Sequence, residues 1–211
     1  MADSESVSAA KRAIRDRTRE RRCAVDARWI AQASAAIVRR VVAMDEFAGA
    51  RVVCCYVATT GEAQTEGIIK ACRTAGKKVC VPALDEEEGC YRLAWLMPGA
   101  DLVSGPMGIR EPREKRWAPV AEVDLMIVPG VAFDAEGGRV GHGFGHYDRL
   151  LADPQGTRCF TVGLAFDFQV WDGVPTEIRD VRMDAVVTET RCHLRKPGGR
   201  VGPSCVSSES E

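Results

Sequence analysis

Residues 51–83 read RVVCCYVATTGEAQTEGIIKACRTAGKKVCVPA and carry the pattern of a strand, a helix and a second strand. The apolar runs at 51–57 and 78–83 are continuous, which is typical of strands that are buried on both faces of a sheet. Between them, a helix is predicted to start at Thr65, its N-cap residue, and to end at Gly76. This alternation predicts an α/β protein with a mostly parallel sheet.

The same alternation continues along the rest of the chain. Further strands are predicted at 91–97, 123–130, 158–166 and 183–190. Helices are predicted from Ser6 or Ser8 to Arg22, from Asp26 onward and from His146 onward. Together these segments predict one three-layer α/β/α domain over residues 7–192, with a Rossmann-like open sheet. Residues 193–211 are rich in Gly, Pro and Ser, so we expect this tail to be disordered.

Composition and charge argue against several classes of partner. The net charge is −1, so no overall electrostatic field favours binding to nucleic acid. The basic segment 11–22 alone is weak evidence for a nucleic-acid-binding surface. No apolar run approaches the length that spans a membrane. The nine cysteines follow no metal-ligand spacing, which fits a reducing compartment. We expect a cytoplasmic monomer that acts on small molecules, with a mitochondrial location as the lesser alternative.

The segment VPGVAFDAEGGRVGHGFGHYDRLL, residues 128–151, is the strongest functional signal. Its six glycines follow a buried strand, the position at which open α/β sheets bind ligands. Closely spaced glycines let successive backbone N–H groups converge on an anion, and the helix start behind them adds a favourable dipole. The pattern predicts a phosphate-binding loop, although a glycine-rich surface loop without chemistry is the alternative.

Familiar nucleotide motifs do not match this segment. The chain has no Gly-Lys-Ser/Thr tripeptide, and G-x-G-x-x-G fails because His146 stands three residues after Gly143. The pattern is instead R-x-G-x-G-x-G-x-Y-D-R. Arg139 is suited to binding a phosphate, and Asp148 to holding Mg²⁺ against it. A zinc site at His142 and His146 is disfavoured, because no carboxylate supplies a third ligand.

The segment 128–151 resembles the signature of the 5-formyltetrahydrofolate cyclo-ligase family. AAKRAIRDRTRERR, YVATTGEAQTEGII, GKKVCVPAL, MGIREP and VPTEIRDVRMDAVVTE are similar to further family segments and follow in family order, from about residue 9 to 190. The resemblance implies an enzyme that uses ATP and Mg²⁺. The γ-phosphate would pass to the formyl oxygen of 5-formyltetrahydrofolate, N10 would attack the formyl carbon, and phosphate would leave as the ring closes. No covalent enzyme nucleophile is implied.

The resemblance also implies roles for particular residues. The N-terminal phosphate contacts would be Lys11 and Arg15, whose i, i+4 spacing places them on one helix face. The ATP loop would comprise Arg139, Val140, Gly141, His142, Gly143, Phe144, Gly145, His146 and Tyr147. The metal ligands would be Asp148 and Asp180, with Asp184 as an alternative to Asp180.

The implied folate contacts are Val57, Glu62, Met107 and His146. Two residues of the chain, His146 and Phe144, depart from the family pattern. The family has Tyr where this chain has His146, so the substitution is expected to weaken folate binding and to add a group that titrates near neutral pH. Phe144 stands where the family often has Lys or Gly, which removes a charge from the loop. These departures motivate an alternative function, a catalytically weakened relative that binds folate or nucleotide.

Overall fold

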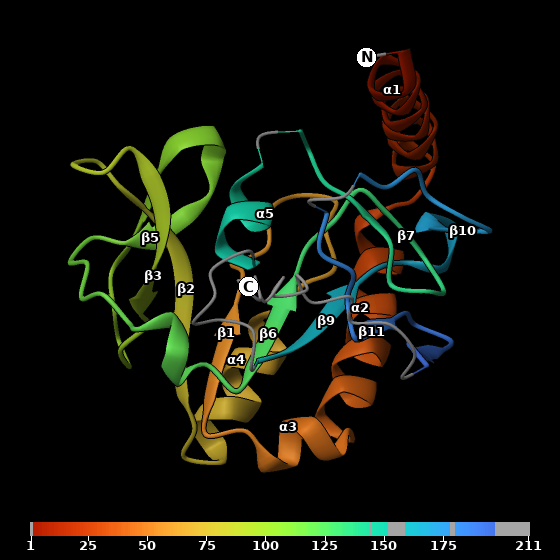
Figure 1. Cartoon of the computed structure of the whole chain (residues 1–211). Coiled ribbons are helices and arrows are strands. Elements are labelled where there is room, and N and C mark those ends of the chain that lie inside the picture. Colours follow the sequence, from red (N-terminus) through yellow and green to blue (C-terminus); the bar gives the residue numbers. More distant parts are fainter. Residues whose placement is uncertain (1, 144, 152–158, 178–179, 197–211) are drawn as a thin grey trace, which may run out of the picture.

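The computed structural model describes residues 2–143, 145–151, 159–177 and 180–196, apart from the side chains of residues 2–4 and 107 (Figure 1). Its centre is a seven-stranded sheet in the order β12-β11-β9-β6-β1-β2-β3. The strands are β1 (Val52–Cys55), β2 (Lys78–Asp85), β3 (Cys90–Trp95), β6 (Leu125–Val128), β9 (Phe160–Leu164), β11 (Ala185–Val187) and β12 (Cys192–Leu194).

The pairing confirms the mostly parallel sheet. β2, β1, β6, β9 and β11 pair in parallel, whereas β3 and β12 add antiparallel edges. β1 and β6 are buried at every position, as their continuous apolar sequences predict. In chain order the parallel strands run 2-1-3-4-5, so the connections reverse direction between β1 and β6. The predicted domain end at residue 192 falls inside β12.

Helices cover one face of the sheet more fully than the other. α2 (Ala27–Val42), α3 (Asp45–Gly49) and α4 (Glu66–Thr74) pack on one face, with Ile37, Phe47 and Ile68 in the shared core. On the second face, α5 (His146–Leu151) contributes Leu150 and Leu151 to a separate core (Figure 1). The fold is therefore the predicted α/β class, with a thinner second helical layer among the described residues.

Helix boundaries follow local hydrogen bonding. α2 begins one residue after the predicted start at Asp26, which is its N-cap residue, because the Asp26 carboxylate accepts a hydrogen bond from the Trp29 N–H at 2.7 Å. Thr65 occupies the N-cap position of α4, but its side chain does not cap the helix. Its buried hydroxyl instead donates to the carbonyl of Tyr56 at 2.7 Å. This bond fixes the start of α4 against the chain that leaves β1.

The N-terminal helix α1 (Ala2–Cys23) confirms the helix predicted to end at Arg22, but it begins before the predicted start at Ser6 or Ser8. Figure 1 shows it standing at the side of the sheet, next to β7 and β10. Ile14 packs against a small buried cluster. The guanidinium groups of Arg17 and Arg21 lie 5.3 and 4.9 Å from the ring centroid of Trp171. These contacts hold a helix with almost no apolar stripe.

Six short strands among the described residues were not predicted, and one of them is the edge strand β12, which extends into the tail that was expected to be disordered. β10 (Val170–Trp171), β7 (Ala132–Asp134) and β8 (Arg139–Val140) form one small sheet, and β4 (Leu102–Ser104) pairs with β5 (Arg110–Pro112). The short 3₁₀ helices are η1 (Pro106–Gly108), η2 (Val120–Glu122) and η4 (Asp167–Gln169). Strands of two or three residues are too short to show a period of two. In the part of the chain that is described, no helix is both long and apolar enough to cross a membrane.

Candidate functional site

A cleft of about 780 Å³ lies at the carboxyl ends of β1 and β6, where the strand connections reverse direction. The predicted site residues that line it are Lys11, Arg15, Val57, Glu62, Arg139, Val140, Gly141, His142, Gly143, Gly145, His146, Tyr147, Asp148 and Asp180. Phe144 lies outside the described residues. Met107 belongs to η1, and its side chain is outside the description. The fold thus gathers in one cleft residues that are far apart in the sequence.

One end of the cleft pairs the cations of α1 with groups from distant segments. The Nζ of Lys11 lies 2.6 Å from Asp180 Oδ2 and 3.4 Å from Glu177 Oε2. The Nε of Arg15 donates to the carbonyl of Gly141 at 2.8 Å. The i, i+4 spacing therefore does place both cations on the face of α1 that meets the cleft.

Arg139 and Asp148 form a second ion pair in the same wall. Arg139 Nη2 lies 2.6 Å from Asp148 Oδ1, and Arg139 Nη1 donates to the Pro129 carbonyl at 3.3 Å. The side chain of Arg139 is 5% exposed and that of Asp148 is 35% exposed. Arg139 therefore orients the more accessible Asp148, which faces the cleft.

The glycines of residues 130–145 divide into two groups. Gly137 and Gly138 form the turn between β7 and β8, where Asp134 accepts the N–H of Gly138 at 2.7 Å. Because Asp134 also takes the Gly137 N–H through its carbonyl, these two amides are not free for a ligand. Only the later part of the loop lines the cleft, including Gly143 and Gly145, whose φ angles are +103° and +67°. The predicted phosphate-binding loop of six glycines is thus longer than the segment that lines the cleft.

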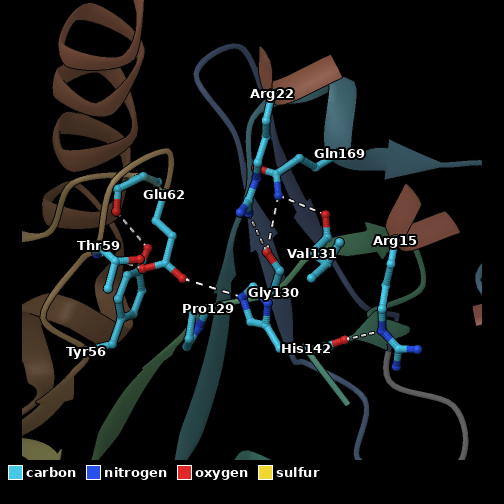
Figure 2. Close-up of polar contacts among 12 residues, drawn as sticks. Arg15, Arg22, Tyr56, Thr59, Glu62, Pro129, Gly130, Val131, His142 and Gln169 are labelled. Atoms are coloured by element: carbon cyan, nitrogen blue, oxygen red, sulfur yellow. Dashed lines mark hydrogen bonds and ion pairs between the residues drawn. The ribbon is translucent and has the colours of Figure 1, made fainter. Parts of the chain in front are cut away.

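Glu62 lies at another part of the cleft, in the turn that follows β1 (Figure 2). Its Oε2 accepts the N–H of Thr59 at 2.9 Å, and its Oε1 lies 3.8 Å from Nε2 of His142. Burial raises the pKa of this carboxyl, but the contacts with His142 and Thr59 and the charge of Arg22 outweigh burial and lower it overall. Glu62 is therefore held as a carboxylate that bridges the β1 turn and the glycine loop.

The chain matches the model of the 5-formyltetrahydrofolate cyclo-ligase family over residues 7–189. The chain belongs to this family. It is 34% identical over 145 residues to the 5-formyltetrahydrofolate cyclo-ligase of Escherichia coli K12, covering 67% of this chain and 80% of the relative. It is 26% identical over 194 residues to the enzyme of Mus musculus, covering 87% and 96%.

Solved structures agree with this assignment. The structure of 5,10-methenyltetrahydrofolate synthetase from Aquifex aeolicus matches with a TM-score of 0.76 at 28% identity, covering 94% of this chain and 99% of that one. A synthetase from Mycoplasma pneumoniae shares the fold, with a TM-score of 0.67 at 18% identity over 85% of this chain and 98% of that one. The chain is thus an enzyme of the cyclo-ligase class.

In this cyclo-ligase an aromatic pair lines the cleft. The rings of His146 and Tyr91 lie 4.5 Å apart between centroids, at an interplanar angle of 53°. Burial, followed by the charge of Arg149, lowers the pKa of His146 and so favours the neutral imidazole. The expected titration near neutrality is thus moved to more acidic pH. Val57, the remaining predicted folate contact, is buried at the cleft wall.

The carboxylates of the cyclo-ligase cleft suit a magnesium ion that arrives with phosphate groups. Asp148 and Asp180 both line the cleft, and the contact of each with Arg139 or Lys11 uses a single carboxylate oxygen. No group of three or more potential ligands gathers among the described residues, so a cage made only of protein is not formed there. Mg²⁺ commonly binds one or two carboxylates together with substrate phosphates, and each of these side chains offers a carboxylate of that kind. Asp184 lies instead at the amino edge of β11, where it binds Thr161 and Arg195.

Several cleft residues were missed from the sequence. Tyr91 was part of an alternating strand, and nothing in its neighbourhood distinguished it from a core residue. Glu177 precedes Asp180 by three residues and shares its contact with Lys11. Thr59 lies in the predicted turn after β1, where its proximity to Glu62 was the available signal.

The variant His146→Tyr is expected to lower the KM for 5-formyltetrahydrofolate about threefold to tenfold, because the larger tyrosine ring would extend the aromatic wall beside Tyr91. Steady-state kinetics at saturating ATP measures this change, with the KM for ATP as the internal control. An unchanged folate KM would mean that the histidine at this position costs nothing in substrate affinity.

Proposed function

We propose that this cyclo-ligase converts 5-formyltetrahydrofolate to 5,10-methenyltetrahydrofolate in an ATP- and Mg²⁺-dependent reaction that releases ADP and phosphate. The observation that carries the proposal is the single cleft in which the cationic α1 face, the glycine loop and Glu62 meet, in a chain that belongs to this family. These elements supply the two kinds of contact that the reaction needs, one for a triphosphate and one for a pterin.

The cationic part of the cleft is suited to the triphosphate. Lys11 and Arg15 would neutralise phosphate oxygens. The amides of Gly141, Gly143 and Gly145 would approach the same oxygens, because glycine has no side chain to obstruct the contact. Lys11 would then exchange its contact with Asp180 for one with phosphate. Asp148 and Asp180 would hold the magnesium ion, which neutralises the charge that develops on the phosphate oxygens.

The remaining part of the cleft is suited to the folate. Glu62 would accept hydrogen bonds from N–H groups of the pterin, because its carboxylate is held ionised at the cleft wall. Val57 and Tyr91 would contact the ring faces and keep water away from them. Met107 is proposed as a further contact from the 3₁₀ helix η1.

The chemistry would follow from holding the two substrates in one orientation. The formyl oxygen attacks the γ-phosphorus and ADP leaves, which makes the formyl carbon electrophilic. The lone pair of N10 then attacks this carbon, the N10 proton is lost, and phosphate departs with the former formyl oxygen. Positioning and charge neutralisation account for catalysis of this type without an enzyme nucleophile.

Purified protein, 5-formyltetrahydrofolate and Mg-ATP test the proposal directly. We expect the near-ultraviolet absorbance of the methenyl product to rise only when ATP and Mg²⁺ are both present. Folded protein that gives no ATP-dependent rise would refute the proposed activity.

A catalytically weakened relative is the second candidate, and the position of His146 at the cleft wall, beside Tyr91, is the observation that favours it. Calorimetry would then detect folate and ATP binding by a protein without turnover. Turnover at rates of about 1 s⁻¹ or more, within the usual range for enzymes, would exclude this candidate.

A further inference from the structure

Arg22, near the C-terminal end of α1, is set apart from the other arginines of this helix by its contacts (Figure 2). Its Nη2 donates to the carbonyl of Gly130 at 3.2 Å, and its Nε is buried without a partner in the described structure. Burial lowers the pKa of Arg22, and the nearby charge of Glu62 opposes that shift. The chain therefore keeps a cation in a place where water solvates it poorly.

The contacts of Arg22 join three segments that surround the cleft. Gly130 follows Pro129 at the end of β6 and opens the segment that leads into the glycine loop. The Gly130 carbonyl also accepts a hydrogen bond from Gln169 Nε2 at 3.1 Å. A Cβ atom on Gly61 would lie 4.0 Å from Cδ of Arg22, so the arginine stem passes beside the turn that carries Glu62.

Glu62 is the charged side chain of the turn beside which the arginine stem passes. The titratable groups that interact electrostatically with it are His142 from the glycine loop, Arg22 from α1, Tyr56 just after β1 and Tyr147 from α5. The negative charge of Glu62 helps to raise the pKa of both tyrosines, so their hydroxyls stay neutral. The side chain of His142 is 53% exposed, whereas the Nε of Arg22 is buried. Arg22 is thus the permanently charged partner of Glu62 in this group.

We propose that Arg22 is a positioning residue for the folate side of the reaction. It holds the ionised Glu62 carboxylate in place relative to Gly130, where the segment that leads into the glycine loop begins. This inference rests on the proposed function, because Glu62 is the proposed pterin contact. Arg22 itself does not line the cleft, so it acts through Glu62 and through the Gly130 carbonyl.

The test compares Arg22→Met, which keeps the apolar stem, with Arg22→Lys, which keeps the charge. For Arg22→Met we expect the KM for 5-formyltetrahydrofolate at pH 7 to rise about tenfold, with kcat and the KM for ATP within about twofold of the unchanged protein. Arg22→Lys is expected to recover most of the lost affinity.

The pH profile separates this role from a merely structural one. Loss of the positive charge raises the pKa of Glu62, so the carboxylate is protonated at a higher pH. The acid limb of kcat/KM for folate should therefore move to higher pH in Arg22→Met and return in Arg22→Lys. In a Glu62→Gln background, the change at Arg22 should produce no such shift.

Arg21→Met is the matched control, because Arg21 contacts the Phe168 carbonyl and Trp171 rather than the Glu62 turn. It should leave the folate KM and the acid limb unchanged. If the unchanged protein turns over and Arg22→Met alters neither quantity, the positioning role is wrong and the proposed function stands. If there is no turnover, folate binding by calorimetry over the same pH range replaces the kinetics. Absence of folate binding at every pH would overturn both proposals.

Discussion

Replacing Asp148 by asparagine is expected to lower kcat at saturating ATP and folate by about 10²- to 10³-fold, because the change removes a proposed ligand charge from the magnesium ion. The side chain is 35% exposed in the cleft, and Asn keeps an oxygen that can accept the hydrogen bond from Arg139. The fold should therefore persist. Kinetics over a range of Mg²⁺ concentrations measures the effect, and excess Mg²⁺ should restore part of the rate.

Glu136→Gln is the matched control for this experiment. Glu136 is an exposed carboxylate in the β7–β8 turn, and it is not part of the cleft wall. Its loss should leave both kcat and the Mg²⁺ dependence near their original values. A large loss of kcat in Asp148→Asn without any change in Mg²⁺ dependence would contradict the metal assignment and leave Asp148 as the partner of Arg139.

Gly137→Ala is expected to destabilise the protein by roughly 3–5 kcal/mol, the largest effect on stability among the changes considered. Gly137 has a φ angle of +82°, and a Cβ atom there would lie 2.1 Å from the carbonyl oxygen of Met183. That oxygen belongs to the backbone and cannot rotate away. The Gly137 carbonyl also accepts the N–H of Met183 at 2.8 Å, so any shift weakens this bond as well.

Thermal unfolding followed by circular dichroism measures this loss, which corresponds to a fall in Tm of roughly 10 °C for a chain of this size. Gly49→Ala is the control, because nothing lies within 4 Å of its added Cβ and Gly49 ends a helix. Its stability should stay within about 1 kcal/mol of the unchanged protein. An equally small effect at Gly137 would show that the close approach to Met183 does not constrain the turn.

The sequence predicts the central sheet well, because its strands are continuous apolar runs. Residues 51–57 and 78–83 form the parallel pair β1 and β2, with α4 between them. The hairpin of β7 and β8 was not predicted, because each strand has only two or three residues, too few to show the alternation of a strand. Gly137 and Gly138 therefore looked like part of the phosphate loop, although they form a turn around Asp134.

The residues of the candidate site were more predictable than their pairing. Arg139 and Asp148 stood out in one motif, but their sequence separation does not reveal the ion pair at 2.6 Å. Arg22 lies in a run of basic residues, and the local sequence does not show which of them is buried in the fold. It differs from Arg21 through the way α1 docks beside Gly130, which depends on contacts more than a hundred residues away in the chain.

The most direct test of the central claim follows the formyl oxygen. If one cleft transfers phosphate to that oxygen before N10 closes the ring, then 5-formyltetrahydrofolate labelled with ¹⁸O in its formyl group should yield phosphate that carries one ¹⁸O atom. Mass spectrometry of the phosphate released by the unchanged protein with Mg-ATP gives the answer. Label in phosphate, in step with methenyl product, is the expected result. Product formation with unlabelled phosphate would contradict the account.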